Sequence, residues 1–126
     1  MAFILALDYD GCCVDDEFPG HGEFKQDIIN KAKEFQKHGA EVVLWTCREG
    51  KYLEEAVANC KKAGLEFTAI NENTPATKAW LEEKHEPLSR KIHADFYADD
   101  KAKNLEIFLK IDIAATCKSF ESRKRR

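Results

Sequence analysis

The sequence predicts an α/β domain in which a central parallel sheet is covered by helices on both faces. Short apolar runs alternate with longer segments of helical period, which is typical of βα units. The length of 126 residues is close to that of one domain and is sufficient for such a sheet. Polar residues follow the apolar runs, and ligands of parallel α/β sheets bind where the strands end.

Four strands are expected from apolar runs of strand length. The run over residues 3–7 lacks polar alternation, which indicates a central strand that is buried on both faces. The run over residues 40–45 has the same character. Shorter strands are expected over residues 67–70 and 94–98.

The first two helices are expected between the first three strands. Apolar residues from Ile28 to Phe35 fall at helical spacing, and Gly39 follows where a left-handed helix end favours glycine. A second helix is expected over residues 51–63, with Gly64 as its stop.

The remaining helices are expected in the second half of the chain. Thr74 and Pro75 fit an N-cap followed by proline at the first helical position, so a third helix is expected over residues 76–84. The apolar residues over 105–109 favour another helix. A short edge strand over residues 110–114 is the alternative.

Residues 1–116 are expected to form one domain, and the basic residues 117–126 a frayed tail or, alternatively, a nucleic-acid contact. The net charge of -3 gives no whole-molecule attraction to nucleic acid or an anionic membrane. The opening residues lack the basic start of a secretory signal, so we expect a cytoplasmic protein with no membrane partner. The five cysteines lack disulfide or zinc spacing and are expected to be reduced.

Acidic residues follow the first and fourth expected strands. Alternation along an extended chain puts Asp8 and Asp10 on the same side, and Gly11 lets the backbone turn away. Asp99 and Asp100 should meet them at the same edge of the sheet. Crowded carboxylates repel one another unless a cation or proton intervenes, and Mg²⁺ favours a few carboxylates completed by water and phosphate. The sequence therefore predicts a Mg²⁺ site.

Donors for phosphoryl oxygens accompany these carboxylates. Thr46, Cys47 and Arg48 follow the second strand. Lys91 precedes the fourth strand and is also expected to hold the Asp8 carboxylate. Arg48 is alternatively a surface cation at the start of the second helix. Further substrate-binding candidates, alternatively simple turn formers, follow the third strand: Asn71, Glu72 and Asn73.

Four features of the chain resemble, in their order, the motifs of the haloacid dehalogenase superfamily: the run LALDYDG, Thr46, Lys91 and the ADD of residues 98–100. The resemblance spans residues 3–104. The runs VVLWTCREGKYLEEAVANC and INEN further resemble a branch of short, single-domain phosphatases. Membership implies a three-layer α/β/α Rossmann-like fold without a cap domain and a Mg²⁺-dependent phosphomonoesterase.

The resemblance also implies a mechanism. Asp8 would attack phosphorus to give an aspartyl-phosphate, while Asp10 protonates the leaving oxygen and later activates water. Mg²⁺ would be held by Asp8, the Asp10 backbone carbonyl and Asp99, with help from Asp100.

Phosphate binding in the family implies roles for residues around the DxDG motif and beyond it. Thr46 and Lys91 would bind the phosphoryl oxygens. The chain has Cys12 where the family usually has threonine or serine after the glycine, so a hydroxyl contact is missing. The backbone N–H at Cys12 can still point at phosphate, and Gly11 beside it is a further substrate-binding candidate.

A small phosphomonoester is the expected substrate, because the acidic flap over residues 11–24 repels a long phosphate backbone. The open, capless site also admits a nucleic-acid end or a phosphoprotein. The rival class is a non-catalytic phosphate-binding or phosphoacceptor domain. A response-regulator receiver places its phosphoacceptor after strand three, where this chain has Ile70 and Asn71, whereas the DxD here follows strand one. The oligomeric state is not predicted.

Overall fold

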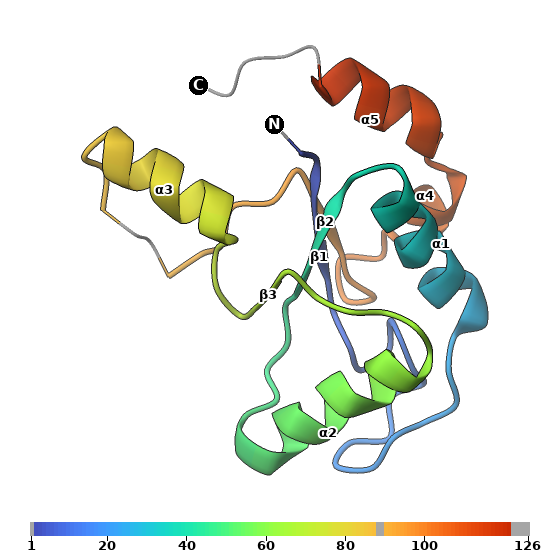
Figure 1. Ribbon diagram of the computed structural model, residues 1–126. Helices are drawn as coiled ribbons and strands as arrows, with labels where there is room; N and C mark the ends of the chain where they lie inside the picture. The colour runs from blue at the N-terminus through green and yellow to red at the C-terminus, as the bar shows by residue number, and fades with distance from the viewer. Residues whose placement is uncertain (1, 88–89, 122–126) are drawn as a thin grey trace.

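The computed structural model describes residues 2–87 and 90–121. Its centre is a parallel sheet of four strands in the order β3-β2-β1-β4 (Figure 1). All four expected strands are present, and each is shorter than expected. The strands are β1 (Ile4–Leu7), β2 (Glu41–Leu44), β3 (Ala69–Ile70) and β4 (Phe96–Ala98).

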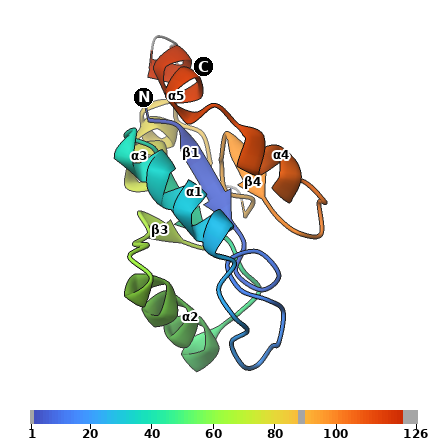
Figure 2. The same ribbon diagram turned by 90° about the vertical axis from the view of Figure 1, so that its right-hand side faces the viewer.

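Helices cover both faces of this sheet, which makes a three-layer α/β/α Rossmann-like fold, as the sequence predicted. In the two views, α1 and α4 lie on one side of the strands and α3 on the other (Figures 1 and 2). The helices of the described part are α1 (Gln26–Lys37), α2 (Gly50–Lys62), α3 (Pro75–Glu83), α4 (Leu105–Lys110) and α5 (Ile113–Glu121).

Strand β1 is buried along its whole length, as expected for a central strand. Leu5 and Leu7 contribute to the main core cluster, which includes the apolar stripe of α1. Ile4 and Ala6 point to the opposite face and form a second cluster. The sheet therefore holds β1 rigidly and fixes where its carboxyl end lies.

Aromatic rings form the middle of the main core. The ring of Phe35 stacks on Phe3 at 5.5 Å and on Phe108 at 5.8 Å between centroids. Phe108 also stacks on Phe96 of β4 at 6.0 Å. Because these rings come from α1, α4, β4 and the residue before β1, they join both ends of the chain to one core.

The residues that were expected to begin or end helices do so. Gly39 and Gly64, which follow α1 and α2, have φ values of 88° and 84°. The Thr74 hydroxyl accepts a hydrogen bond from the Thr77 backbone N–H at 3.2 Å, and Pro75 opens α3.

The expectation of a frayed tail from residue 117 is wrong for residues 117–121, which form the second half of α5. Ile113, Cys117 and Phe120 fall at helical spacing and pack on the core, and the Phe120 ring meets Phe3 edge-on at 5.6 Å. The alternative strand over residues 110–114 is not formed, because α4 ends at Lys110 and α5 begins at Ile113. The rest of the tail lies outside the described residues. Across the described ranges, the helices are too short or too polar to cross a membrane.

Candidate active site

Three carboxylates converge at the carboxyl edge of the sheet. Strands β1 and β4 are parallel neighbours, with Leu7 paired to Ala98, and the Asp8 backbone N–H donates to the Ala98 carbonyl at 3.1 Å. Asp8 therefore lies beside Asp99 and Asp100. One carboxylate oxygen from each lies within 4.8 Å of the other two.

This crowding perturbs the Asp8 carboxyl. Its pKa is raised from the ordinary 3.8 to about 7, mainly by burial. The Tyr9 backbone N–H lowers this pKa, whereas the charges of Asp99 and Asp100 contribute to raising it. Among the described residues, Oδ1 of Asp100 is a buried side-chain oxygen without a hydrogen-bond partner. An all-oxygen donor set with an unsatisfied buried oxygen fits a hard dication such as Mg²⁺.

Gly11 permits the close approach of the first loop to this cluster. A Cβ at this position would lie 2.3 Å from Oδ2 of Asp100, and the glycine has a φ of 81°. The Gly11 N–H donates to the Val14 carbonyl at 2.8 Å. The turn that follows β1 therefore already uses the Gly11 N–H, which corrects the assignment of Gly11 as a substrate-binding residue.

Cys12 is also turned away from the site. Its N–H donates to the Tyr9 carbonyl at 3.1 Å, and its buried thiol faces the Ala98 carbonyl at 3.7 Å. Burial, followed by the charge of Asp8, raises the thiol pKa far above its ordinary value. Cys12 is a packing residue in this arrangement, which corrects its assignment as a substrate-binding residue.

A cavity of about 330 Å³ opens beside the three carboxylates. Thr46 lies on its wall, where the sequence placed a phosphate-binding hydroxyl. The Thr46 N–H donates to the Asn71 side-chain oxygen at 2.8 Å, and its hydroxyl accepts from the Arg48 N–H at 3.2 Å. The lining residues are Asp8, Trp45, Thr46, Cys47, Asp99 and Lys101.

Two of the residues that sequence reasoning missed belong to the loop after β4. Lys101 lines the cavity, and its N–H donates to Asp99 Oδ1 at 2.9 Å. Asn104 accepts from the Asp99 N–H at 3.0 Å and donates to the Tyr97 carbonyl at 2.7 Å, so it fixes the loop. The available signals were a lysine adjacent to the aspartate pair and an asparagine in a turn.

Lys91 lines a different pocket and not the cavity beside Asp8. Its ammonium is 5.4 Å from the centroid of the Tyr97 ring, and it shares the pocket with Asn73 and His93. The Asn73 side-chain oxygen accepts from the His93 N–H at 2.6 Å and so holds the segment that precedes β4. This arrangement does not place Lys91 among the residues that line the Asp8 cavity, contrary to expectation.

The two asparagines after β3 support loops, which agrees with the alternative that they are turn formers. Asn71 adopts a left-handed conformation with a φ of 52° and positions Thr46. Asn73 is 6% exposed and bonds to the His93 backbone. Both side chains are used within the protein. Glu72 between them forms an ion pair with Lys78.

Arg48 is buried, with 2% of its surface exposed, so the alternative of a surface cation is wrong. Its Nε and Nη2 donate to the two Asp10 carboxylate oxygens at 2.8 and 2.7 Å. The Asp10 carboxylate is thus drawn to Arg48 and is not part of the three-carboxylate cluster, contrary to the expected convergence with Asp8. The tight turn over residues 9–14 ends the extended alternation on which that expectation depended.

The Arg48 guanidinium also binds the flap. Nη1 donates to the Pro19 carbonyl at 3.3 Å, and Nη2 donates to the Gly20 carbonyl at 2.6 Å. The group lies over the rings of Tyr9 and Phe18, 4.8 and 5.0 Å from their centroids. With these partners it does not face a phosphate, which corrects its predicted role in substrate binding.

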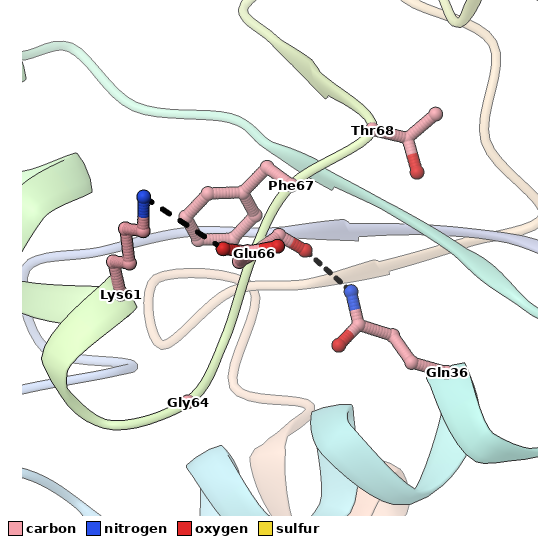
Figure 3. A pocket seen from close by; sticks show the side chains of 6 residues that line it. All are labelled: Gln36, Lys61, Gly64, Glu66, Phe67 and Thr68. Carbon is pink, nitrogen blue, oxygen red and sulfur yellow. Dashed lines mark hydrogen bonds and ion pairs between the residues drawn. The ribbon is translucent and has the colours of Figure 1, made fainter.

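A larger depression of about 500 Å³ lies at the opposite edge of the sheet (Figure 3). It surrounds the segment before β3, at the amino ends of the strands. Lys61 pairs with the Glu66 carboxylate at 3.9 Å, and the Gln36 amide donates to the Glu66 carbonyl. Lys61 and Gln36 thus both contact Glu66 here. Three carboxylates converge at the other edge, which is therefore the candidate site.

The fold and the site define an α/β protein with an acidic cluster at the carboxyl edge of a parallel sheet. No family model matches the chain, and no curated protein matches it. Among solved structures, a conserved protein from Bacteroides thetaiotaomicron is similar, with 30% sequence identity and a TM-score of 0.68. The match covers 99% of this chain and 94% of that one. The chain belongs to the same family as that conserved protein.

Proposed function

We propose that this protein is a Mg²⁺-dependent phosphohydrolase of the haloacid dehalogenase superfamily that acts on small phosphomonoesters. The observation that carries the proposal is the convergence of Asp8, Asp99 and Asp100 beside a cavity. The order of the motifs in the sequence supports the assignment to this superfamily. The cavity of about 330 Å³ suits a small ester, and the exposed acidic residues of the flap disfavour a nucleic-acid backbone.

Asp8, Asp99 and Asp100 would hold the cation, together with the Asp10 backbone carbonyl that the family resemblance implies. A bound Mg²⁺ would supply positive charge that neutralises the phosphoryl oxygens and favours the ionised form of the neighbouring carboxylates. That charge matters for Asp8, because a carboxyl with a pKa of about 7 is only partly ionised at neutral pH.

The side chains of the protein have distinct roles in the two steps of the proposed reaction. An Asp8 oxygen forms a bond to phosphorus while the ester P–O bond breaks, and Asp10 gives its proton to the leaving oxygen. In the second step water attacks phosphorus, Asp10 takes a proton from it, and the bond between phosphorus and Asp8 breaks to release phosphate. The Thr46 hydroxyl and the Lys101 ammonium are the donors on the cavity wall for phosphoryl oxygens.

A non-catalytic phosphate-binding domain is the second candidate. The observation in its favour is the Asp10 carboxylate, which is bound by Arg48 and lies outside the three-carboxylate cluster. If the Asp10 carboxylate does not reach the leaving oxygen of a bound ester, the protein would bind phosphate without protonating a leaving group.

Phosphate release from a panel of phosphorylated metabolites, with and without Mg²⁺, tests the proposal. Wild type should release phosphate only with Mg²⁺, and Asp8→Asn should abolish turnover. Asp16→Asn, a matched change at an exposed flap residue, should retain it. If wild type binds Mg²⁺ and phosphate but turns nothing over, the binding-domain candidate replaces the enzyme.

A further inference from the structure

We infer that Arg48 is a positioning residue that fixes the Asp10 carboxylate and the flap as one unit. The inference rests on the proposed function, because the group that Arg48 positions is the proposed proton donor, Asp10. The guanidinium donors of Arg48 are used by the Asp10 carboxylate and by two flap carbonyls, so Arg48 acts through Asp10 and not on phosphate.

The first argument is the geometry of the Arg48–Asp10 pair. A guanidinium binds a carboxylate through two parallel hydrogen bonds in one plane, and the distances here are 2.8 and 2.7 Å. The side chain of Arg48 is 1% exposed, whereas that of Asp10 is 19% exposed. The arginine is thus the buried anchor, and the carboxylate is the part that solvent reaches.

The second argument is that the same guanidinium binds the flap backbone. Its bonds to the Pro19 and Gly20 carbonyls use donors that the carboxylate leaves available. A buried cation needs such partners, because an unpaired charge inside a protein is strongly destabilising. Movement of the flap away from Arg48 would therefore also disturb the group that orients Asp10.

Independent contacts hold the flap in the same place. The Tyr9 hydroxyl lies 2.6 Å from Nδ1 of His21, and Nε2 of His21 lies 3.2 Å from the Glu55 carboxylate. The ring of Phe18 meets that of Tyr52 at 5.5 Å. The flap is thus attached to α2 at two points, and Arg48 extends this attachment to the proposed proton donor.

Lysine cannot reproduce this arrangement, because an ammonium is a single point charge without the planar fork of a guanidinium. Arg48→Lys should therefore behave as a defective variant although it keeps the charge. Arg48→Met removes the charge and keeps an unbranched apolar side chain. Lys51→Met is the matched control, since Lys51 is an exposed cation on α2 whose ammonium lies over Tyr52 and not at Asp10.

The kinetic test compares kcat/KM for two esters whose leaving groups differ in basicity. The leaving oxygen of glycerol 3-phosphate must receive a proton as the P–O bond breaks. The p-nitrophenolate that leaves p-nitrophenyl phosphate departs without a proton. Both Arg48 variants should lose about 100-fold in kcat/KM with glycerol 3-phosphate, the scale of general acid catalysis, and much less with p-nitrophenyl phosphate. Asp10→Asn should give the same pattern, and Lys51→Met should match wild type.

The second readout does not depend on turnover. Hydrogen exchange of the flap amides in the metal-free protein should be about 10-fold faster in Arg48→Met than in wild type and Lys51→Met, because two backbone anchors are lost. Equal losses for both esters, or unchanged flap exchange in both Arg48 variants, would overturn the positioning role. If wild type hydrolyses no ester, the proposed function fails, and the exchange result still decides whether Arg48 anchors the flap.

Discussion

Replacement of Asp8 by asparagine should stabilise the metal-free protein above neutral pH. The folded protein holds the Asp8 proton with a pKa of about 7, compared with the ordinary value of 3.8. A carboxyl whose pKa is raised on folding contributes full stability below about pH 4, and this contribution is lost as the pH rises towards 7. Asparagine cannot ionise, so the variant does not undergo this loss.

The structure sets the size of the effect. A rise from 3.8 to about 7 corresponds to about 4 kcal/mol at about 1.4 kcal/mol for each pKa unit. Asp8 is only partly buried, and screening by solvent reduces this to about 2 kcal/mol. We therefore expect Asp8→Asn to be about 2 kcal/mol more stable than wild type at pH 8 and nearly equal to it at pH 4.

Urea unfolding in EDTA, followed by tryptophan fluorescence between pH 4 and 8, measures this difference. The exposed variant Asp16→Asn controls for the loss of one negative charge. Mg²⁺ should stabilise wild type at pH 8 and have little effect on Asp8→Asn. A constant difference in unfolding free energy between Asp8→Asn and wild type over this pH range would refute the reasoning.

Three further substitutions test the site and the core. Gly11→Ala places a Cβ 2.3 Å from the half-buried Asp100 carboxylate at a φ of 81°, and should lower the unfolding free energy by about 3 kcal/mol in urea titrations. Lys101→Met should raise KM for a phosphomonoester about 10-fold. A larger rise in KM for Lys91→Met than for Lys101→Met would show that Lys91 moves into the site. Phe35→Ala, which removes a fully buried ring stacked on two others, should cost about 4 kcal/mol in the same titrations.

Matched variants separate these causes. Gly39 has a φ of 88° and nothing within 4 Å of a Cβ, so Gly39→Ala should cost only the left-handed strain of about 1–2 kcal/mol. An equal cost at Gly11 would exclude the steric conflict. Lys62→Met, an exposed change on α2, controls for loss of a lysine, and it should leave KM unchanged. A loss below about 1 kcal/mol for Phe35→Ala would mean that the aromatic stack contributes little.

The fold could be predicted from the sequence because its signals are local. The continuous apolar run at β1, the glycines after α1 and α2, and the Thr74–Pro75 pair each determine structure within a few residues. The C-terminal helix α5 was missed because the basic composition of the tail obscured the spacing of Ile113, Cys117 and Phe120.

The site could be predicted only in part. The meeting of Asp8 with Asp99 and Asp100 follows from a topological rule for parallel strands, and it needs no knowledge of side-chain directions. The direction of Asp10 depends instead on the turn after β1 and on a buried arginine 38 residues further along the chain. Such long-range pairs leave no local pattern in a single sequence.

The pairing of β1 with β4 also bears on how the protein is synthesised. Asp8 follows β1, which leaves the ribosome before the other strands of this sheet, whereas its partners Asp99 and Asp100 emerge about 90 residues later. A nascent chain that has completed β1, β2 and β3 still lacks two of the three carboxylates. The ability to bind a cation at this edge therefore arises late in synthesis, when the fourth strand docks, and would report that both halves of the chain have come together.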